Sequence, residues 1–87
     1  MKDKIFYEFK GTFGNDIKVF YCTGLQMMKI LLEARQDEFK VMQLFMERCV
    51  TIDNVKATED ELDKIPASDF MDISDAIGKQ ISKMKFI

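Results

Sequence analysis

The sequence has no histidine, only two cysteines and no glycine-rich phosphate-binding loop. Without histidine, the chain lacks the commonest general base and the commonest zinc ligand of proteins. The spacing of Cys22 and Cys49 matches no zinc-binding or redox motif, and each stands among apolar residues, so we expect two free and structurally inert thiols. These absences predict that the protein is not an enzyme and holds neither a cofactor nor a metal ion.

A strong net charge and long apolar runs are missing as well. The 13 Lys and Arg residues nearly balance the 15 Asp and Glu residues, so the net charge of −2 gives no electrostatic basis for binding nucleic acid or anionic membranes. No apolar run approaches the roughly 18 residues that a membrane span requires. The residues after Lys4 alternate in polarity, unlike the continuous apolar core of a signal peptide. We therefore expect a cytoplasmic protein.

The acidic residues are concentrated between positions 59 and 75. Seven of the 15 acidic residues lie in this stretch: Glu59, Asp60, Glu61, Asp63, Asp69, Asp72 and Asp75. Their spacing lacks the alternating ligands, central glycine and closing glutamate of a calcium-binding loop. We expect a solvated acidic face, with an electrostatic site for a partner as the alternative.

The sequence does contain enough apolar material for a single folded domain, residues 1–87. Apolar residues make up 47% of the chain and include eight phenylalanines, while 32% of the residues are charged. A chain of this length buries about 60–65% of its unfolded surface on folding. The core is therefore small, and the domain is expected to be only modestly stable.

The N-terminal quarter predicts a β-hairpin over residues 4–22. Apolar and polar residues alternate on both sides of a turn-rich stretch around Gly14. The inward face would carry Ile5, Tyr7, Phe9, Ile17, Val19 and Tyr21. Since an isolated hairpin is marginal in water, this face must rest on helices.

The rest of the chain predicts helices over residues 24–35, 37–50, 59–65 and 66–84, approximately, with a linker over residues 51–57. Two helix starts have the spacing of a capping box, formed by Thr23 with Gln26 and by Thr58 with Glu61. Pro66 ends the third helix and suits the first turn of the last one. The predicted fold is α+β, an N-terminal hairpin followed by three to four helices packed as a small bundle.

Helical periodicity predicts which residues face the core. They are Leu25, Met28, Leu31 and Leu32 in the first helix, Phe39, Met42, Phe45, Met46 and Cys49 in the second, and Phe70, Ile73, Ile77, Ile81 and Met84 in the last. The opposite face of the last helix carries Asp69, Asp72, Asp75, Lys79 and Lys83. That face is expected to be solvated.

The two middle helices also carry a second apolar face. It consists of Met27, Ile30, Ala34, Val41 and Leu44. A helix that is apolar nearly all round either lies centrally in the core or is covered by a partner. Flexible methionine side chains suit surfaces that accept irregular partner helices. Ordinary core packing is the simplest interpretation of this face; the functional hypothesis is a groove for a partner helix, and a homo-oligomer contact is the third alternative.

The last third of the chain has a capped acidic turn that leads through a proline into an amphipathic helix. The residues of this pattern are Thr58, Glu61, Leu62, Ile65, Pro66, Asp69, Phe70, Ile73 and Ile77. Together with the hairpin and the helical middle, it resembles the small tail assembly chaperones of long-tailed bacteriophages and prophages, including the Mu-like and P2-like examples. The resemblance implies a non-catalytic protein that binds the helical tape measure protein, or another tail protein, in the cytoplasm of the bacterial host.

A second interpretation stays open beside the resemblance. Another interaction protein of a phage or mobile element, such as a structural adaptor or an inhibitor of a host factor, would equally lack catalytic residues and carry an apolar binding face.

Overall fold

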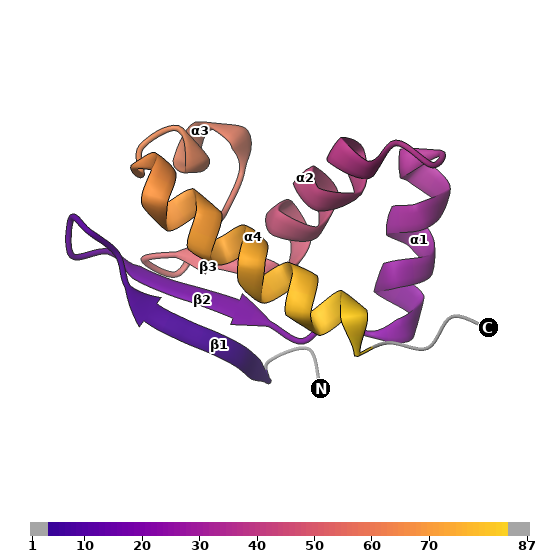
Figure 1. Ribbon diagram of the computed structural model, residues 1–87, viewed down its shortest axis with the longest axis horizontal. Helices are drawn as coiled ribbons and strands as arrows, with labels where there is room; N and C mark the ends of the chain where they lie inside the picture. Colours follow the sequence, from indigo (N-terminus) through magenta and orange to yellow (C-terminus); the bar gives the residue numbers. More distant parts are fainter. Residues whose placement is uncertain (1–3, 84–87) are drawn as a thin grey trace.

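The computed structural model describes residues 4–83 and has the α+β architecture that the sequence predicts. The strands are β1 (Ile5–Lys10), β2 (Asp16–Phe20), β3 (Val50–Ile52) and β4 (Val55–Lys56), and they form one antiparallel sheet in that order. The helices are α1 (Gly24–Ala34), α2 (Glu38–Cys49), α3 (Glu59–Leu62) and α4 (Ala67–Ser82). Helix α4 crosses the strands, and α1 and α3 lie toward opposite ends of the molecule (Figure 1).

The predicted hairpin is present, but it is half of a four-stranded sheet. The stretch expected to be a linker forms β3 and β4, and Val50, expected to end the second helix, begins β3. Asp53 and Asn54 form the turn between these strands with φ values of 52° and 67°, the left-handed pair that a tight two-residue hairpin turn requires. The helices therefore pack on a sheet instead of forming a bundle around a lone hairpin.

The Asp53 carboxylate joins the two hairpins. It accepts hydrogen bonds from Asn15 Nδ2 at 2.8 Å and from the backbone N–H of Asp16 at 2.9 Å. These bonds lower the pKa of Asp53, the side-chain bond from Asn15 contributing most. The turn of the second hairpin is thus attached to the start of β2.

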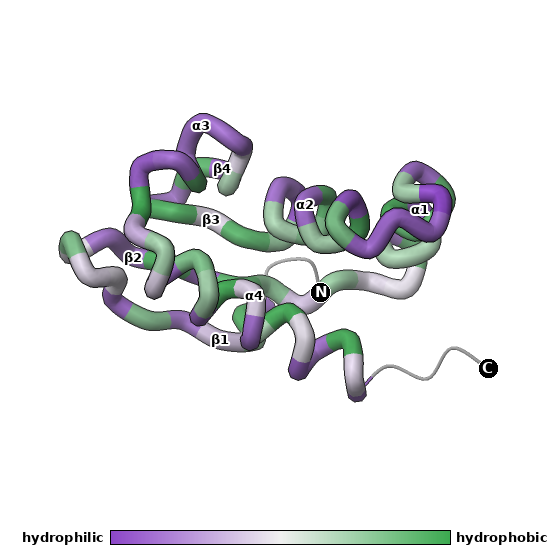
Figure 2. Tube along the Cα trace, turned by 45° about the horizontal axis from the view of Figure 1, so that its top comes forward, coloured by the Kyte–Doolittle hydropathy of each residue, from purple (hydrophilic) through white to green (hydrophobic). Residues whose placement is uncertain are grey.

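One face of the sheet supplies much of the core. Ile17 pairs with Ile52 and Val19 with Val50, and all four side chains are buried. Helix α2 contacts β2, β3 and β4, and α4 contacts β2, so these two helices cover that face. The hydrophobic β3 lies against them, whereas α3 is strongly hydrophilic (Figure 2).

Strand β1 departs from the predicted alternation. Its register with β2 shifts between Ile5 and Tyr7, where a bulge places Phe6. Phe6 packs edge-to-face against Tyr21, with ring centroids 5.2 Å apart, and is partly buried against the core. Ile5, Tyr7 and Tyr21, expected to face inward, are exposed; Ile5 and Tyr7 belong to β1 at the edge of the sheet, and Tyr21 follows the end of β2.

The helix boundaries follow local hydrogen bonding. Thr23 and Gln26 form the predicted capping box, and Asp37 caps α2 by accepting from the N–H groups of Phe39 and Lys40. The second predicted capping box does not form, since the Thr58 side chain makes no cap bond, and α3 ends at Leu62 instead of continuing to residue 65. Helix α4 ends at Ser82, and Met84 lies outside the described residues.

Helix α4 packs inward through Ile73 and Ile77, both fully buried as predicted, while Phe70 is 38% exposed. Contrary to the prediction of a solvated acidic face, Asp69 is only 3% exposed. Its two oxygens accept from the backbone N–H and the hydroxyl of Thr12, each at 2.8 Å. The N-terminal end of α4 is therefore anchored to the loop between β1 and β2.

The C-terminal half of α4 has a matching anchor. The buried Gln80 amide accepts from the N–H of Cys22 at 2.7 Å and donates to the carbonyl of Phe20 at 3.2 Å. Buried polar groups stabilise a fold only when their hydrogen bonds are satisfied, and here both anchors satisfy backbone groups of the hairpin as well. Helix α4 is thus held to the first hairpin at two points.

The Asp69 anchor requires a glycine at position 11. A Cβ at Gly11 would lie 2.6 Å from Asp69 Oδ2 and 3.1 Å from Ile17 Cδ1. We predict that Gly11→Ala lowers the free energy of unfolding by about 1–3 kcal/mol through overpacking, measured by urea denaturation. The matched control is Gly78→Ala, an exposed position in α4 where a Cβ meets nothing within 4 Å. That substitution should stabilise the protein by about 0.5–1 kcal/mol.

A double-mutant cycle isolates the contact between the two residues. Combining Gly11→Ala with Asp69→Ala should cost less than the sum of the single changes, because the clash disappears with the carboxylate. Strict additivity would show that the anchor does not constrain this position.

Candidate functional site

The residues predicted to form a partner groove are largely core residues. Met27, Ile30, Ala34 and Leu44 are buried, and Val41 is half-buried against the core. This face therefore packs in the core, as the ordinary-core interpretation has it, and it does not form the hypothesised groove. Helix α1 is apolar around most of its circumference, so periodicity alone does not determine which side packs inward. The packing of α1 on α2, where Glu33 pairs with Arg48, selects the Met27 side.

The opposite side of α1, predicted to be core, is exposed. We call it the α1 outer face, and it consists of Leu25, Met28, Leu31 and Leu32. Leu32 is 69% exposed, and the other three side chains are also exposed. Clustered apolar residues on a surface are typical of a contact site.

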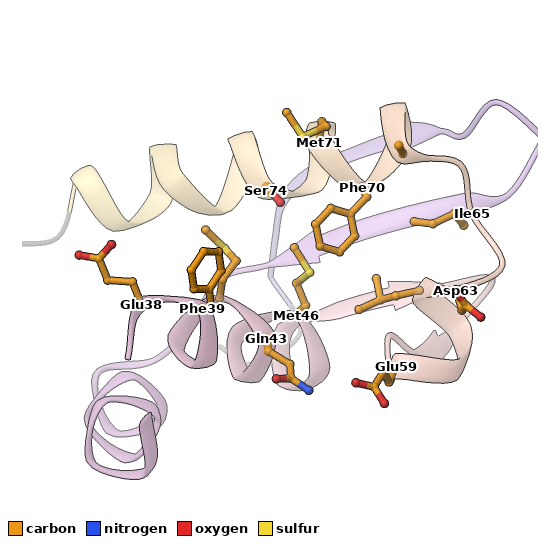
Figure 3. A pocket seen from close by; sticks show the side chains of 13 residues that line it. Glu38, Phe39, Gln43, Met46, Glu59, Asp63, Ile65, Phe70, Met71 and Ser74 are labelled. Atoms are coloured by element: carbon orange, nitrogen blue, oxygen red, sulfur yellow. The ribbon is translucent and has the colours of Figure 1, made fainter. Parts of the chain in front are cut away.

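A second apolar surface is a groove bordered by α2, α3 and α4, with a volume of about 820 Å³. We call it the α2–α4 groove. Its lining residues are Glu38, Phe39, Met42, Gln43, Met46, Glu59, Leu62, Asp63, Ile65, Ala67, Phe70, Met71 and Ser74. Figure 3 shows the Phe39 and Phe70 side chains in the space between α2 and α4.

The groove has a buried floor and exposed walls. Met46 is 1% exposed and Ile65 is buried, so these side chains close the bottom. The walls are far more exposed, at 89% for Phe39 and 66% for Met71. A partner that covered these large apolar side chains would remove their surface from water, and this burial would lower the free energy of the complex.

Each wall is one face of a helix. Helix α4 contributes Ala67, Phe70, Met71 and Ser74, at the spacing i, i+3, i+4, i+7, and α2 contributes residues between Glu38 and Met46. The two helices run in opposite directions, so the start of α2 lies away from the start of α4 (Figures 1 and 3). The short turn through α3 and Pro66 brings Leu62 and Ile65 to the end near Met46.

The charges of the groove are all negative. Among the described residues, those charged in its lining are Glu38, Glu59 and Asp63, and no Lys or Arg lines it. Glu38 lies at one end, whereas Glu59 and Asp63 lie at the other, beside α3 (Figure 3). The middle of the groove is apolar apart from Gln43 and Ser74.

The polar side chains that line the groove are three carboxylates, one amide and one hydroxyl, from Glu38, Glu59, Asp63, Gln43 and Ser74. In the described part of the chain, no group of three or more acidic or cysteine side chains is arranged to hold a metal ion. None of the helices described is long and apolar enough to cross a membrane. The chemistry that the groove supports is the burial of an apolar surface between acidic ends.

The groove was missed because its lining combines core residues with exposed ones. Met42 and Met46 were assigned to the core and do pack there, Phe39 and Phe70 were assigned to the core but are exposed, and Met71 was assigned to neither face. One signal was available in α4, where Met71 stands beside Phe70 and widens an otherwise narrow apolar stripe. An apolar pair of this kind on a helix with a complete core stripe indicates a second contact surface.

The two cysteines are free, as predicted, and they interact with each other. The neighbouring Cys49 thiol lowers the pKa of Cys22 below its ordinary value of 9.0; partial burial opposes this shift, and the positive charge of Arg48 supports it. The proximity of Cys22, together with burial, raises the pKa of Cys49. Cys22 is therefore the more reactive thiol.

We predict that iodoacetamide alkylates Cys22 in the native protein with a pH midpoint below 9.0, and leaves the buried Cys49 unmodified. Lower pKa means that the reactive thiolate is present at lower pH. In Cys49→Ala the neighbouring thiol that lowers the pKa of Cys22 is gone, so the midpoint should move upward. Mass spectrometry of the alkylated peptides checks both points. An unchanged midpoint in the variant, or equal labelling of both thiols, would contradict the interaction.

Comparison with protein-family models, with curated protein sequences and with solved structures finds no match to this chain.

Proposed function

We propose that the protein is a non-catalytic tail assembly chaperone, and that its α2–α4 groove holds an apolar helical segment of a phage tape measure protein. The observation that carries the proposal is the exposure of Phe39, Phe70 and Met71 around a buried apolar floor. An amphipathic helix laid into such a groove would cover these side chains in the helix-in-groove mode of recognition.

The physics of the proposed client agrees with this binding mode. A tape measure protein, as the resemblance implies, is a long helical chain whose apolar stripe is uncovered until tube subunits surround it. Exposed apolar stripes aggregate unless they are masked. A groove lined by three methionines, Met42, Met46 and Met71, can adapt to successive segments of irregular shape because thioether side chains are flexible.

A structural adaptor is the second candidate, and the α1 outer face favours it. No residue of α1 lines the groove, so the chain presents two separate apolar surfaces. An adaptor would use both surfaces, one for each partner, whereas a chaperone of the proposed kind needs only the groove.

We predict that Phe39→Asp and Met71→Asp each abolish capture of tape measure fragments, because a carboxylate would have to be desolvated against an apolar stripe. Both residues are exposed, so circular dichroism should show an unchanged fold. Leu32→Asp, the matched control on the α1 outer face, should leave capture intact. Ile30→Asp is unsuitable, since Ile30 is fully buried and the variant would unfold.

The pattern of losses separates the two candidates. Loss in the groove variants alone supports the chaperone proposal. Loss in Leu32→Asp, with capture retained by Phe39→Asp and Met71→Asp, would place the client on the α1 outer face and contradict the proposed site. Fragments that fail to bind the unmodified protein would contradict the chaperone proposal itself.

A further inference from the structure

We infer that the α2–α4 groove selects a helix with a short apolar stripe and Lys or Arg residues at both ends of that stripe. The inference deepens the proposed function, because it rests on a helix occupying the groove.

The walls set the length of the apolar stripe. The lining residues of α2 extend from Glu38 to Met46, and those of α4 from Ala67 to Ser74. At about 1.5 Å of rise per residue, either wall is roughly 12 Å long. An occupant lying along the groove therefore needs two to three turns of apolar stripe, supplied by side chains at spacings of three and four residues.

The ends set the charge. Glu38 closes one end of the groove, and Glu59 and Asp63 close the end beside α3 (Figure 3). The nearby Lys64 is paired with Glu61 through a 3.1 Å bond, and it does not line the groove. Since the whole chain carries 13 basic and 15 acidic residues, a lining with three acids and no base is a local feature.

Charge complementarity favours a helix with basic ends over one with acidic ends. Acidic ends repel an acidic helix and attract a basic one, and each exposed charge pair changes affinity by roughly two- to fivefold in low salt. Three such charges make the difference between a basic-flanked and an acidic-flanked helix about tenfold or more. The α1 outer face of a second copy is a poorer fit, because its basic residues, Lys29 and Arg35, lie in the middle and at the C-terminal end of α1 and none lies at its N-terminal end.

The test uses two fluorescent peptides of 18 residues with the same leucine stripe at helical spacing. One peptide has lysines at both ends of the stripe, and the other has glutamates. Fluorescence anisotropy with the full chain should give a dissociation constant about tenfold or more lower for the lysine peptide at low salt. The difference should shrink at high salt, because exposed charges are screened.

A pair of charge-neutral variants locates the effect. Glu59→Gln combined with Asp63→Asn should weaken the lysine peptide about three- to tenfold and strengthen the glutamate peptide. The control is Asp72→Asn combined with Asp75→Asn, which removes the same charge from residues of α4 that border a separate small hollow beside Phe6 and Tyr7. That control should change affinity by less than about twofold. Met71→Asp should abolish binding of the lysine peptide, which would show that the peptide binds in the α2–α4 groove.

The outcomes distinguish this inference from the proposed function. Equal affinity for both peptides, or failure of both peptides while tape measure fragments bind, overturns the charge selection and leaves the chaperone proposal standing. Tight binding of the lysine peptide without capture of tape measure fragments overturns the chaperone proposal alone. Self-association that both Leu32→Asp and Met71→Asp prevent would show a second copy in the groove and overturn the inference.

Discussion

The structure depends on the attachment of α4 to the first hairpin by two buried polar side chains. Asp69 binds Thr12 in the loop between β1 and β2, and Gln80 binds the backbone where β2 ends. Between these anchors, Ile73 and Ile77 pack into the core. Apolar contacts are non-directional, whereas hydrogen bonds specify one register of the helix on the sheet. The register of α4 in turn decides which of its residues are left to line the groove.

Local signals in the sequence predicted most of the fold. The alternation in residues 4–22 located the hairpin, and Thr23 and Pro66 located the starts of α1 and α4, because each signal acts through neighbouring residues. The β3–β4 hairpin was missed because its strands are two or three residues long and gain their stability from pairing with β2. The burial of Asp69 likewise depends on Thr12, which is 57 positions away.

The candidate site was much less predictable. Periodicity showed that α1 is apolar on two sides, but the choice between them depends on how closely α1 approaches α2. The small Ala34 lies on the side that packs inward, whereas Leu25 and Leu32 are left in solvent. Periodicity misleads at Phe39 as well. This residue continues the core stripe of α2, but its side chain is exposed because the start of α2 lies away from the sheet (Figure 1). A groove between two helices is a property of their spacing, which no single helix encodes.

The direct passage of α2 into β3 governs how the groove can widen. Cys49 ends the helix and Val50 begins the strand, so no loop separates them, and both side chains are buried. Displacing the Met46 end of α2 would therefore also displace β3 from its pairing with β2, so the groove cannot widen at that end without breaking backbone hydrogen bonds of the sheet.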